Sequence, residues 1–190
     1  MGFLDALFGR PRMKAPDMER IFALPAASLT LLSEAGLQPD GRAGLCLKAV
    51  DSGEFAAIEA DLRQLLDLAT RDFKGDLDVR SDEYGYRWVL FGDPKLDELV
   101  NLIHLTGSTL QEKGFGEQLL AAVFRFREST GSPFFLIYHY KRGSFYPFAP
   151  TGGAKTRDEA LEFRVSAVIS REIPVEKDTS RWFPLWDCPV

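Results

Sequence analysis

The sequence predicts a single α+β domain in which a mainly antiparallel β-sheet is flanked by helices. Apolar residues recur at helical spacing in two long segments, and short apolar or alternating segments follow them. Turns that contain glycine or proline join these short segments, as they do in β-hairpins. With 190 residues, 45% of them apolar, the chain is long enough to bury one core.

An amphipathic and basic segment, residues 1–14, precedes the domain predicted over residues 15–190. Its apolar residues recur at helical spacing and are Phe3, Leu4, Leu7 and Phe8. Its basic residues follow at once and are Arg10, Arg12 and Lys14. This composition is typical of a segment that lies in a membrane interface and contacts anionic lipid. The alternative is that the segment folds back onto the domain.

The next part of the chain has a less certain pattern. A brief helix is expected over residues 18–24, ending at Pro25. Residues 28–38 fit either a strand or a helix, because Leu29 and Leu31 alternate whereas Leu29, Leu32 and Ala35 share a helical face. The Pro-Asp-Gly turn at residues 39–41 favours a hairpin.

Two long helices are predicted in the central region, with a pair of strands between them. Asp51 and Glu54 form a capping box for a helix that runs to Ala69. Residues 76–92 read as two strands around a turn near residues 81–85. Asp93 and Pro94 then begin a second helix, which Gly114 ends.

The last third predicts more strands and a terminal helix. Residues 118–129 and 133–140 read as adjacent strands, and a two-residue turn at Arg142 and Gly143 leads into a return strand. Pro147 cannot donate a ladder hydrogen bond, so this strand is expected at a sheet edge. Residues 157–171 fit a helix or a strand, and the helix is preferred.

The aromatic stretch IYHYKRGSFYPFAP, residues 137–150, has two interpretations. Rings interleaved with Lys141 and Arg142 suit stacking on a nucleic-acid ligand. On a strand, however, Phe135, Ile137 and His139 face one way and the rings between them face the other. A strand covered on both faces explains this pattern, so we expect core.

Charge and cysteine content restrict the class of protein. The net charge of −5 argues against nucleic acid as a partner. Cys46 and Cys188 are the two cysteines, which is too few for a disulfide framework. There is no signal-peptide pattern and no apolar run long enough to span a bilayer. A cytoplasmic protein, in peripheral contact with membrane at most, is expected.

No catalytic, cofactor or metal site is predicted. APTGGAKT, residues 149–156, lacks two glycines of a phosphate-binding loop, and two histidines are too few for a histidine-rich metal site. The competing hypothesis is a small-molecule-binding protein, or a hydrolase or transferase built on carboxylates. Its candidate residues are Asp76, Asp78, Asp82 and Glu83. A deep pocket lined by two or more of them would favour it.

The C-terminal RWFPLWDCPV carries a large apolar surface on a segment that its prolines prevent from forming a regular helix. Trp182, Phe183 and Trp186 either wrap around the domain or contact a partner, and wrapping is favoured because exposed rings would form a large apolar patch.

Five stretches together resemble the phage shock protein A (PspA)-associated family, PspAB. They are MGFLDALFGR, EYGYRWVLFGDP, LIHLTGSTLQEKGFGEQLL, YKRGSFYPFAP and RWFPLWDCPV. The resemblance implies a cytoplasmic protein linked with PspA in membrane stress, and it favours the membrane interpretation of the N-terminal segment. Together with the missing catalytic residues, it leads us to expect a non-enzymatic adaptor that acts with a PspA-like partner. It brings no catalytic residues, and it leaves the partner surface and the oligomeric state open. A weaker likeness to type III secretion chaperones concerns the fold alone.

Overall fold

The computed structural model describes residues 18–48, 53, 60, 64, 76–152 and 155–190. The N-terminal segment 1–14 and the helix expected over residues 51–69 are predictions that lie outside the part described structurally, apart from the isolated helical positions 53, 60 and 64.

A six-stranded antiparallel sheet forms the centre of the fold. Its strands are β1 (Leu37–Leu47), β2 (Asp76–Ser81), β3 (Arg87–Gly92), β4 (Leu119–Glu128), β5 (Pro133–His139) and β6 (Ser144–Phe148). Their order across the sheet is β2-β3-β1-β4-β5-β6. A separate two-stranded hairpin pairs β7 (Pro150–Thr151) with β8 (Thr156–Arg157). The predicted α+β class is confirmed.

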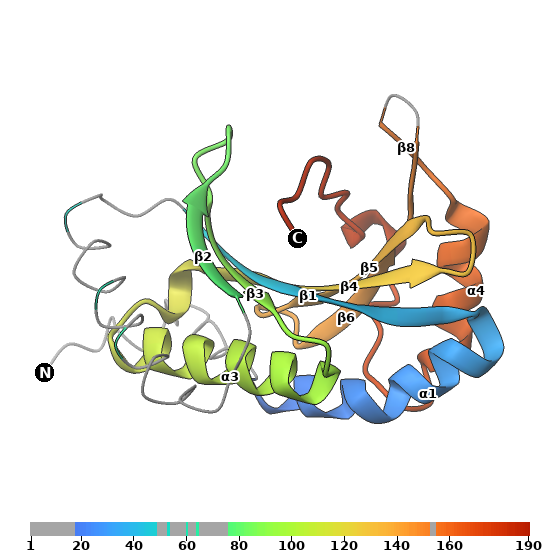
Figure 1. Ribbon diagram of the computed structural model, residues 1–190, viewed down its shortest axis with the longest axis horizontal. Coiled ribbons are helices and arrows are strands. Elements are labelled where there is room, and N and C mark those ends of the chain that lie inside the picture. The colour runs from blue at the N-terminus through green and yellow to red at the C-terminus, as the bar shows by residue number, and fades with distance from the viewer. Residues whose placement is uncertain (1–17, 49–52, 54–59, 61–63, 65–75, 153–154) are drawn as a thin grey trace, which may run out of the picture.

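Helices cover one face of the sheet. They are α1 (Leu24–Ala35), α3 (Leu96–Glu112) and α4 (Glu159–Ile169), with short 3₁₀ turns η1 (Glu19–Ala23), η2 (Gly116–Gln118) and η3 (Thr179–Arg181). The sheet curves away from α1 and α3, and the C-terminal segment lies in the hollow on the other side (Figure 1). The helix-side core takes Tyr138 and Phe124 from the strands and Leu31, Ile103 and Val165 from the helices.

Helix α1 decides between the two interpretations of residues 28–38. The brief helix predicted over residues 18–24 is a 3₁₀ turn that leads directly into α1. Pro25 lies in the first turn of α1, where a backbone N–H has no acceptor within the helix, so the N–H that proline lacks is not missed. The helical face that the sequence suggested is wrong, however. Leu29 and Leu32 are exposed, whereas Leu24, Ala27 and Leu31 are buried.

The hairpin predicted at residues 39–41 is also wrong. Strand β1 runs straight through this Pro-Asp-Gly sequence and pairs with β4 on both sides of it. The pairing register shifts between Pro39 and Ala43, so a β-bulge absorbs the extra residues. Gly41 has φ 68°, which lets the turn sequence bend the strand without reversing it.

The other elements follow the predictions closely. Strands β2 and β3 surround the turn expected near residues 81–85, and the terminal segment is the helix α4. Helix α3 begins at Leu96, two residues after the predicted start at Pro94, and its N-cap is Lys95 rather than Asp93. Asp93 Oδ1 accepts a hydrogen bond from the Lys95 N–H at 2.7 Å. The β5–β6 loop is longer than predicted, because residues 140–143 separate the strands. Strand β6, which contains Pro147, lies at a sheet edge as expected.

Strand β5 is covered on both faces, as its rings predicted. Phe134, Leu136 and Tyr138 belong to the helix-side core. Phe135 and Ile137 belong to a second cluster on the opposite face, together with Trp182 and Val190 from the C-terminus. The aromatic stretch is therefore mostly core, and the C-terminal segment packs against the sheet.

Candidate functional site

A cavity of about 760 Å³ opens on the sheet face opposite the helices. Its floor is the sheet, one wall is the β2–β3 hairpin, and the other wall is the C-terminal segment. A cavity of this size is within the usual range for ligand sites. The three parts of the cavity come from distant parts of the sequence.

The floor follows one cross-strand row of the sheet. The paired residues run Arg80, Trp88, Cys46, Ala121 and His139 across β2, β3, β1, β4 and β5. Directly opposed residues of antiparallel strands project their side chains to the same face. All five residues of the row line the cavity. The floor therefore combines an indole, a thiol and an imidazole.

Asp82 organises the hairpin wall. Its Oδ1 accepts hydrogen bonds from the backbone N–H groups of Tyr84 at 3.0 Å and Tyr86 at 2.9 Å. Its Oδ2 accepts from Trp88 Nε1 at 2.8 Å. One carboxylate thus fixes both the hairpin tip and the buried indole below it. Tyr84 and Tyr86 remain exposed at the rim.

The opposite wall is the C-terminal strap, which we define as residues 182–190. Residues 183–189 of the strap line the cavity. The Trp186 ring packs edge-on against Phe148 of β6, with ring centroids 5.0 Å apart. Phe183 is 53% exposed at the rim. The strap therefore presents apolar side chains both to the sheet and to the opening.

His139 is a titratable residue of the floor whose pKa is changed by its surroundings. Burial lowers the pKa of His139 below its ordinary value of 6.5, and the charges of Arg142 and Lys141 lower it further. Its Nδ1 is buried without a hydrogen-bond partner among the described residues. His139 therefore lines the floor with a lowered pKa, and its Nδ1 is buried rather than exposed to the cavity.

We expect the folded protein to lose stability as the pH falls below about 6.5, partly through His139. Below that pH the unfolded chain binds a proton that the folded chain still refuses, so the unfolded state is favoured. NMR titration should give a lower pKa for His139 in the folded protein than in the urea-unfolded protein. His139→Gln should flatten the stability profile between pH 5 and 7, and an unchanged profile would contradict this assignment.

Both cysteines line the cavity and are held as thiols. Burial raises the pKa of Cys46 to about 12 and that of Cys188 to about 11. In the floor row, Ala121 separates Cys46 from His139, so their strands lie about 9 to 10 Å apart. This spacing puts the imidazole beyond hydrogen-bond reach of the thiol, unlike the base in a cysteine nucleophile pair.

We expect Cys46 to react very slowly with iodoacetamide in the native protein at pH 7.5. Only a thiolate attacks the reagent, and a buried thiol with a pKa of about 12 is almost fully protonated at that pH. Mass spectrometry of the native and urea-unfolded protein measures the difference, which should exceed about 100-fold from the thiolate fraction and burial together. Equal rates in the two states would show that Cys46 is not covered.

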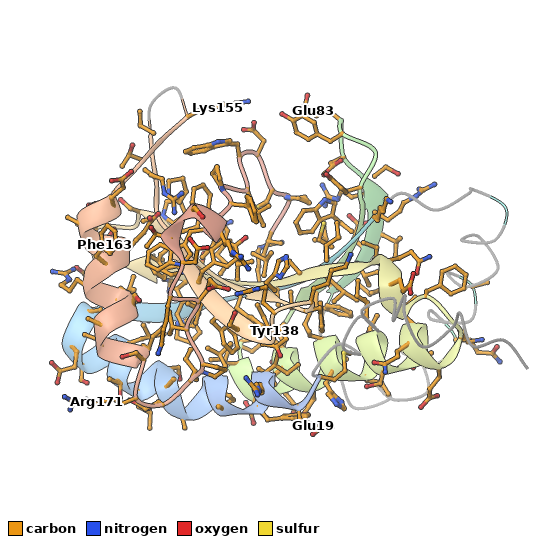
Figure 2. The ribbon with its side chains drawn as sticks, turned by 180° about the vertical axis from the view of Figure 1, so that it is seen from behind. Glu19, Glu83, Tyr138, Lys155, Phe163 and Arg171 are labelled. Carbon is orange, nitrogen blue, oxygen red and sulfur yellow. The ribbon has the colours of Figure 1, made fainter. Side chains whose placement is uncertain are left out.

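The predicted site residues fall into separate groups in the structure. Trp182 is buried, Phe183 is exposed and Trp186 is half-buried, all within the strap. Asp82 and Glu83 line the cavity, with Glu83 at the hairpin tip (Figure 2), whereas Asp76 and Asp78 do not. The N-terminal contact residues 3–14 lie outside the described residues. The sequence analysis missed Trp88, Cys46, His139 and Tyr146, because only the strand register brings them together.

One family model matches the whole chain. It is described as PspAB, PspA associated protein B, and it covers residues 1–190. The chain belongs to the PspAB family. No curated protein and no solved structure matches the chain. The resemblance found in the sequence is thus confirmed.

The PspAB name implies association with PspA but identifies no residue or surface. Among the helices that the structure describes, none is both long enough and apolar enough to cross a bilayer. Within the same residues, His, Cys, Asp and Glu side chains form no group of three that is placed to hold a metal ion. The cavity of about 760 Å³ is the candidate site that we consider among the described residues.

Proposed function

We propose that this PspAB-family protein is a non-enzymatic adaptor in a PspA-type envelope stress response. It binds a PspA-like protein and acts in the cytoplasm, peripherally at the inner face of the membrane. The family match over residues 1–190 is the observation that carries the proposal, because the family is described by its association with PspA. The structure supports it with a surface suited to protein contact.

The rim of the cavity has the composition of a protein-binding surface. Tyr84 is 60% exposed and Phe183 is 53% exposed, on opposite walls. Aromatic residues dominate the energetic centres of protein interfaces, because they bury a large area at a small entropic cost. We assign the partner contact to these two rings and to the half-buried Trp186. Trp182 contributes indirectly, because it holds the strap.

Surface plasmon resonance with a purified PspA-like protein from the same source tests this surface. Tyr84→Ser and Phe183→Ser should each weaken binding at least tenfold, since each removes a ring at the rim. Leu29→Ser is the matched control, because Leu29 is 71% exposed but lies on the helical face. If only Leu29→Ser lost binding, the contact would lie on α1 instead of the cavity rim. If all three variants bound like the wild type, neither the rim nor this face of α1 would be the contact.

The N-terminal segment supplies the proposed membrane contact. Phe3, Leu4, Leu7 and Phe8 would enter the interface, with Arg10, Arg12 and Lys14 near the lipid charge. Each basic residue adds about 1 kcal/mol near an anionic surface, and salt weakens this contribution. Liposome sedimentation should show weak, salt-sensitive binding that Phe3→Ser/Phe8→Ser abolishes. Equal sedimentation of the variant and the wild type would show that the segment does not bind lipid.

The carboxylate hydrolase or transferase is retained as a second candidate because Asp82 and Glu83 both line the cavity. Asp82 is a poor general base, since three donors already occupy its oxygens. Glu83 is exposed and is the better candidate. Hydrolysis of p-nitrophenyl esters or phosphates that Glu83→Gln abolishes would favour this function, and activity that survives Glu83→Gln would exclude this residue.

A further inference from the structure

Aromatic side chains line both walls and the floor of the cavity of about 760 Å³. Tyr84 and Tyr86 lie on the hairpin wall, where they are 60% and 39% exposed. Phe183 and Trp186 lie on the strap wall, and Trp88 lies in the floor. The face of an aromatic ring carries a partial negative charge. A cavity bounded by rings on several sides can therefore hold a cation against a ring face.

Carboxylates dominate the charged groups of this lining. The acidic side chains are Asp82, Glu83 and Asp187, and Arg80 is basic. Arg80 is already paired, because its Nη2 lies 2.7 Å from Oδ2 of Asp78, which does not line the cavity. Among the described residues that form the lining, negative charge thus exceeds positive charge.

The hydrogen bonds of Asp82 do not neutralise its charge. Its described donors are the backbone N–H groups of Tyr84 and Tyr86 and the indole N–H of Trp88, all of which are uncharged. Neutral donors stabilise the charged form of a carboxylate and leave its net charge in place. A cation that enters the cavity therefore meets a negative charge directly beside the Trp88 indole.

The electrostatic environment changes from one end of the floor to the other. Toward the hairpin, the charge of Asp82 adds to the effect of burial in raising the pKa of Cys46. At the β5 end, Arg142 and Lys141 add to the effect of burial in lowering the pKa of His139. Negative charge disfavours a thiolate, and positive charge disfavours an imidazolium. A cation is thus favoured near Asp82 and disfavoured near His139.

The lining suits an organic cation better than a metal ion. A calcium ion takes about six to eight oxygen ligands, whereas the described His, Cys, Asp and Glu side chains form no group of three that is placed to hold a metal. An alkylammonium ion needs no fixed set of ligands, because its carbon atoms pack against aromatic rings. The volume of the cavity is within the usual range for a small organic ligand.

We propose that the cavity binds a small organic cation of the alkylammonium class. The charged nitrogen lies at the hairpin end, beside the Asp82 carboxylate and against the Tyr86 ring, above the Trp88 indole. The alkyl part extends toward the strap wall. This site goes beyond the proposed adaptor function, because the ligand lies inside the cavity whereas the PspA-like partner contacts its rim.

The probe is hexyltrimethylammonium, and hexanesulfonate is the matched anion of the same chain length. Isothermal titration calorimetry of the full-length protein measures both. The cation should bind at least about tenfold more tightly than the anion, because the carboxylates attract one and repel the other. Equal affinities would overturn the proposal, and so would the absence of cation binding at millimolar concentration. The titrations contain no PspA-like protein, so their outcome does not depend on the adaptor function.

Two double variants test the carboxylates. Glu83→Gln/Asp187→Asn removes two negative charges from the lining, and asparagine tolerates the left-handed φ of 59° at residue 187. Glu34→Gln/Glu112→Gln is the matched control, because it removes the same charge from exposed positions on α1 and α3. The cavity variant should bind hexyltrimethylammonium at least about tenfold more weakly and hexanesulfonate more tightly, whereas the control should behave like the wild type. Equal effects of the two variants would overturn the site.

Tyr86→Leu tests the ring separately from the charges. Leucine keeps an apolar side chain, and the backbone N–H that donates to Asp82 Oδ1 is unchanged. Loss of the cation–π attraction should weaken hexyltrimethylammonium binding at least about threefold and leave hexanesulfonate binding unchanged. An equal loss for both probes would show that the ring supplies apolar contact alone, and the placement of the nitrogen against Tyr86 would be wrong.

Discussion

Trp182→Ala should lower the free energy of unfolding by about 3 to 5 kcal/mol, the usual cost of removing a buried tryptophan side chain. The indole is almost fully buried, donates a hydrogen bond to the Glu176 carbonyl oxygen, and lies 5.5 Å from the Phe163 ring. Its loss leaves a cavity and an unpaired carbonyl where the strap begins. Urea denaturation followed by circular dichroism measures the change.

The neighbouring Phe183→Ala provides the control for this prediction. Phe183 is 53% exposed, so its removal should change stability by about 0.5 kcal/mol or less. Similar losses in the two variants would show that the strap does not pack through Trp182. A stable Trp182→Ala protein with accelerated Cys46 alkylation would show that the strap detaches while the sheet stays folded.

Glu162→Ala should be comparably destabilising, by about 3 to 5 kcal/mol, because it leaves a partly buried cation without its partner. The Glu162 side chain is 2% exposed and its Oε2 lies 2.6 Å from Arg157 Nη2. Its Oε1 accepts hydrogen bonds from the Ala149 N–H at 2.8 Å and from Arg157 Nε at 2.9 Å. Thermal and urea denaturation measure the loss.

Two further variants test the reason for this loss. Glu159→Ala removes an exposed carboxylate from the same first turn of α4 and should be nearly neutral. Glu162→Leu/Arg157→Met replaces both charges by apolar groups and should recover much of the stability. If the double variant were as unstable as Glu162→Ala, the cause would be the Ala149 N–H or packing, and the charge explanation would be wrong.

Arg157 links this ion pair to the strap, because its Nη1 donates to the Trp182 carbonyl oxygen. Glu162→Ala should therefore also accelerate Cys46 alkylation. The two large effects are predicted to be coupled, so the double variant with Trp182→Ala should cost less than the sum of its parts.

The sequence predicted the elements whose apolar period is carried by many residues. Strands β3 to β6 were found because they are short, nearly continuous apolar runs, and helix α3 because its apolar residues recur at helical spacing. Glycine or proline also lies near their ends. The double coverage of β5 was also predictable, since Phe134 and Phe135 are neighbours that face opposite ways.

Two local signals were outweighed by long-range pairing. The Pro-Asp-Gly turn at residues 39–41 has strong turn propensity, but pairing of β1 with β4 on both sides of it, and with β3 beyond it, extends the strand. In α1, Leu29 and Leu32 have the spacing of a buried face, yet burial is decided by Leu24 and Leu31, which meet the sheet core. Tertiary contacts are invisible in such short windows.

The cavity was not predictable from local sequence for a different reason. Its floor is a row of residues that depends on the register of four strand pairs, and a shift of one residue would turn each side chain to the other face. Trp182, Phe183 and Trp186 were recognised as a notable group from composition alone. The sequence did not indicate that Val190, at the end of that segment, packs against Gly44, where an added Cβ atom would leave it no room.

The strand order also affects how copies of this protein meet one another. An open sheet has two edges, and unpaired edge strands invite edge-to-edge aggregation. Strand β2 at one edge carries Asp76, Asp78 and Arg80, and such charges discourage the addition of another strand. At the other edge, Phe145 of β6 already bonds to Pro174 and Glu176, and Pro147 offers no N–H. Fibril-like growth of the sheet is therefore disfavoured in both directions, even while the strap is released.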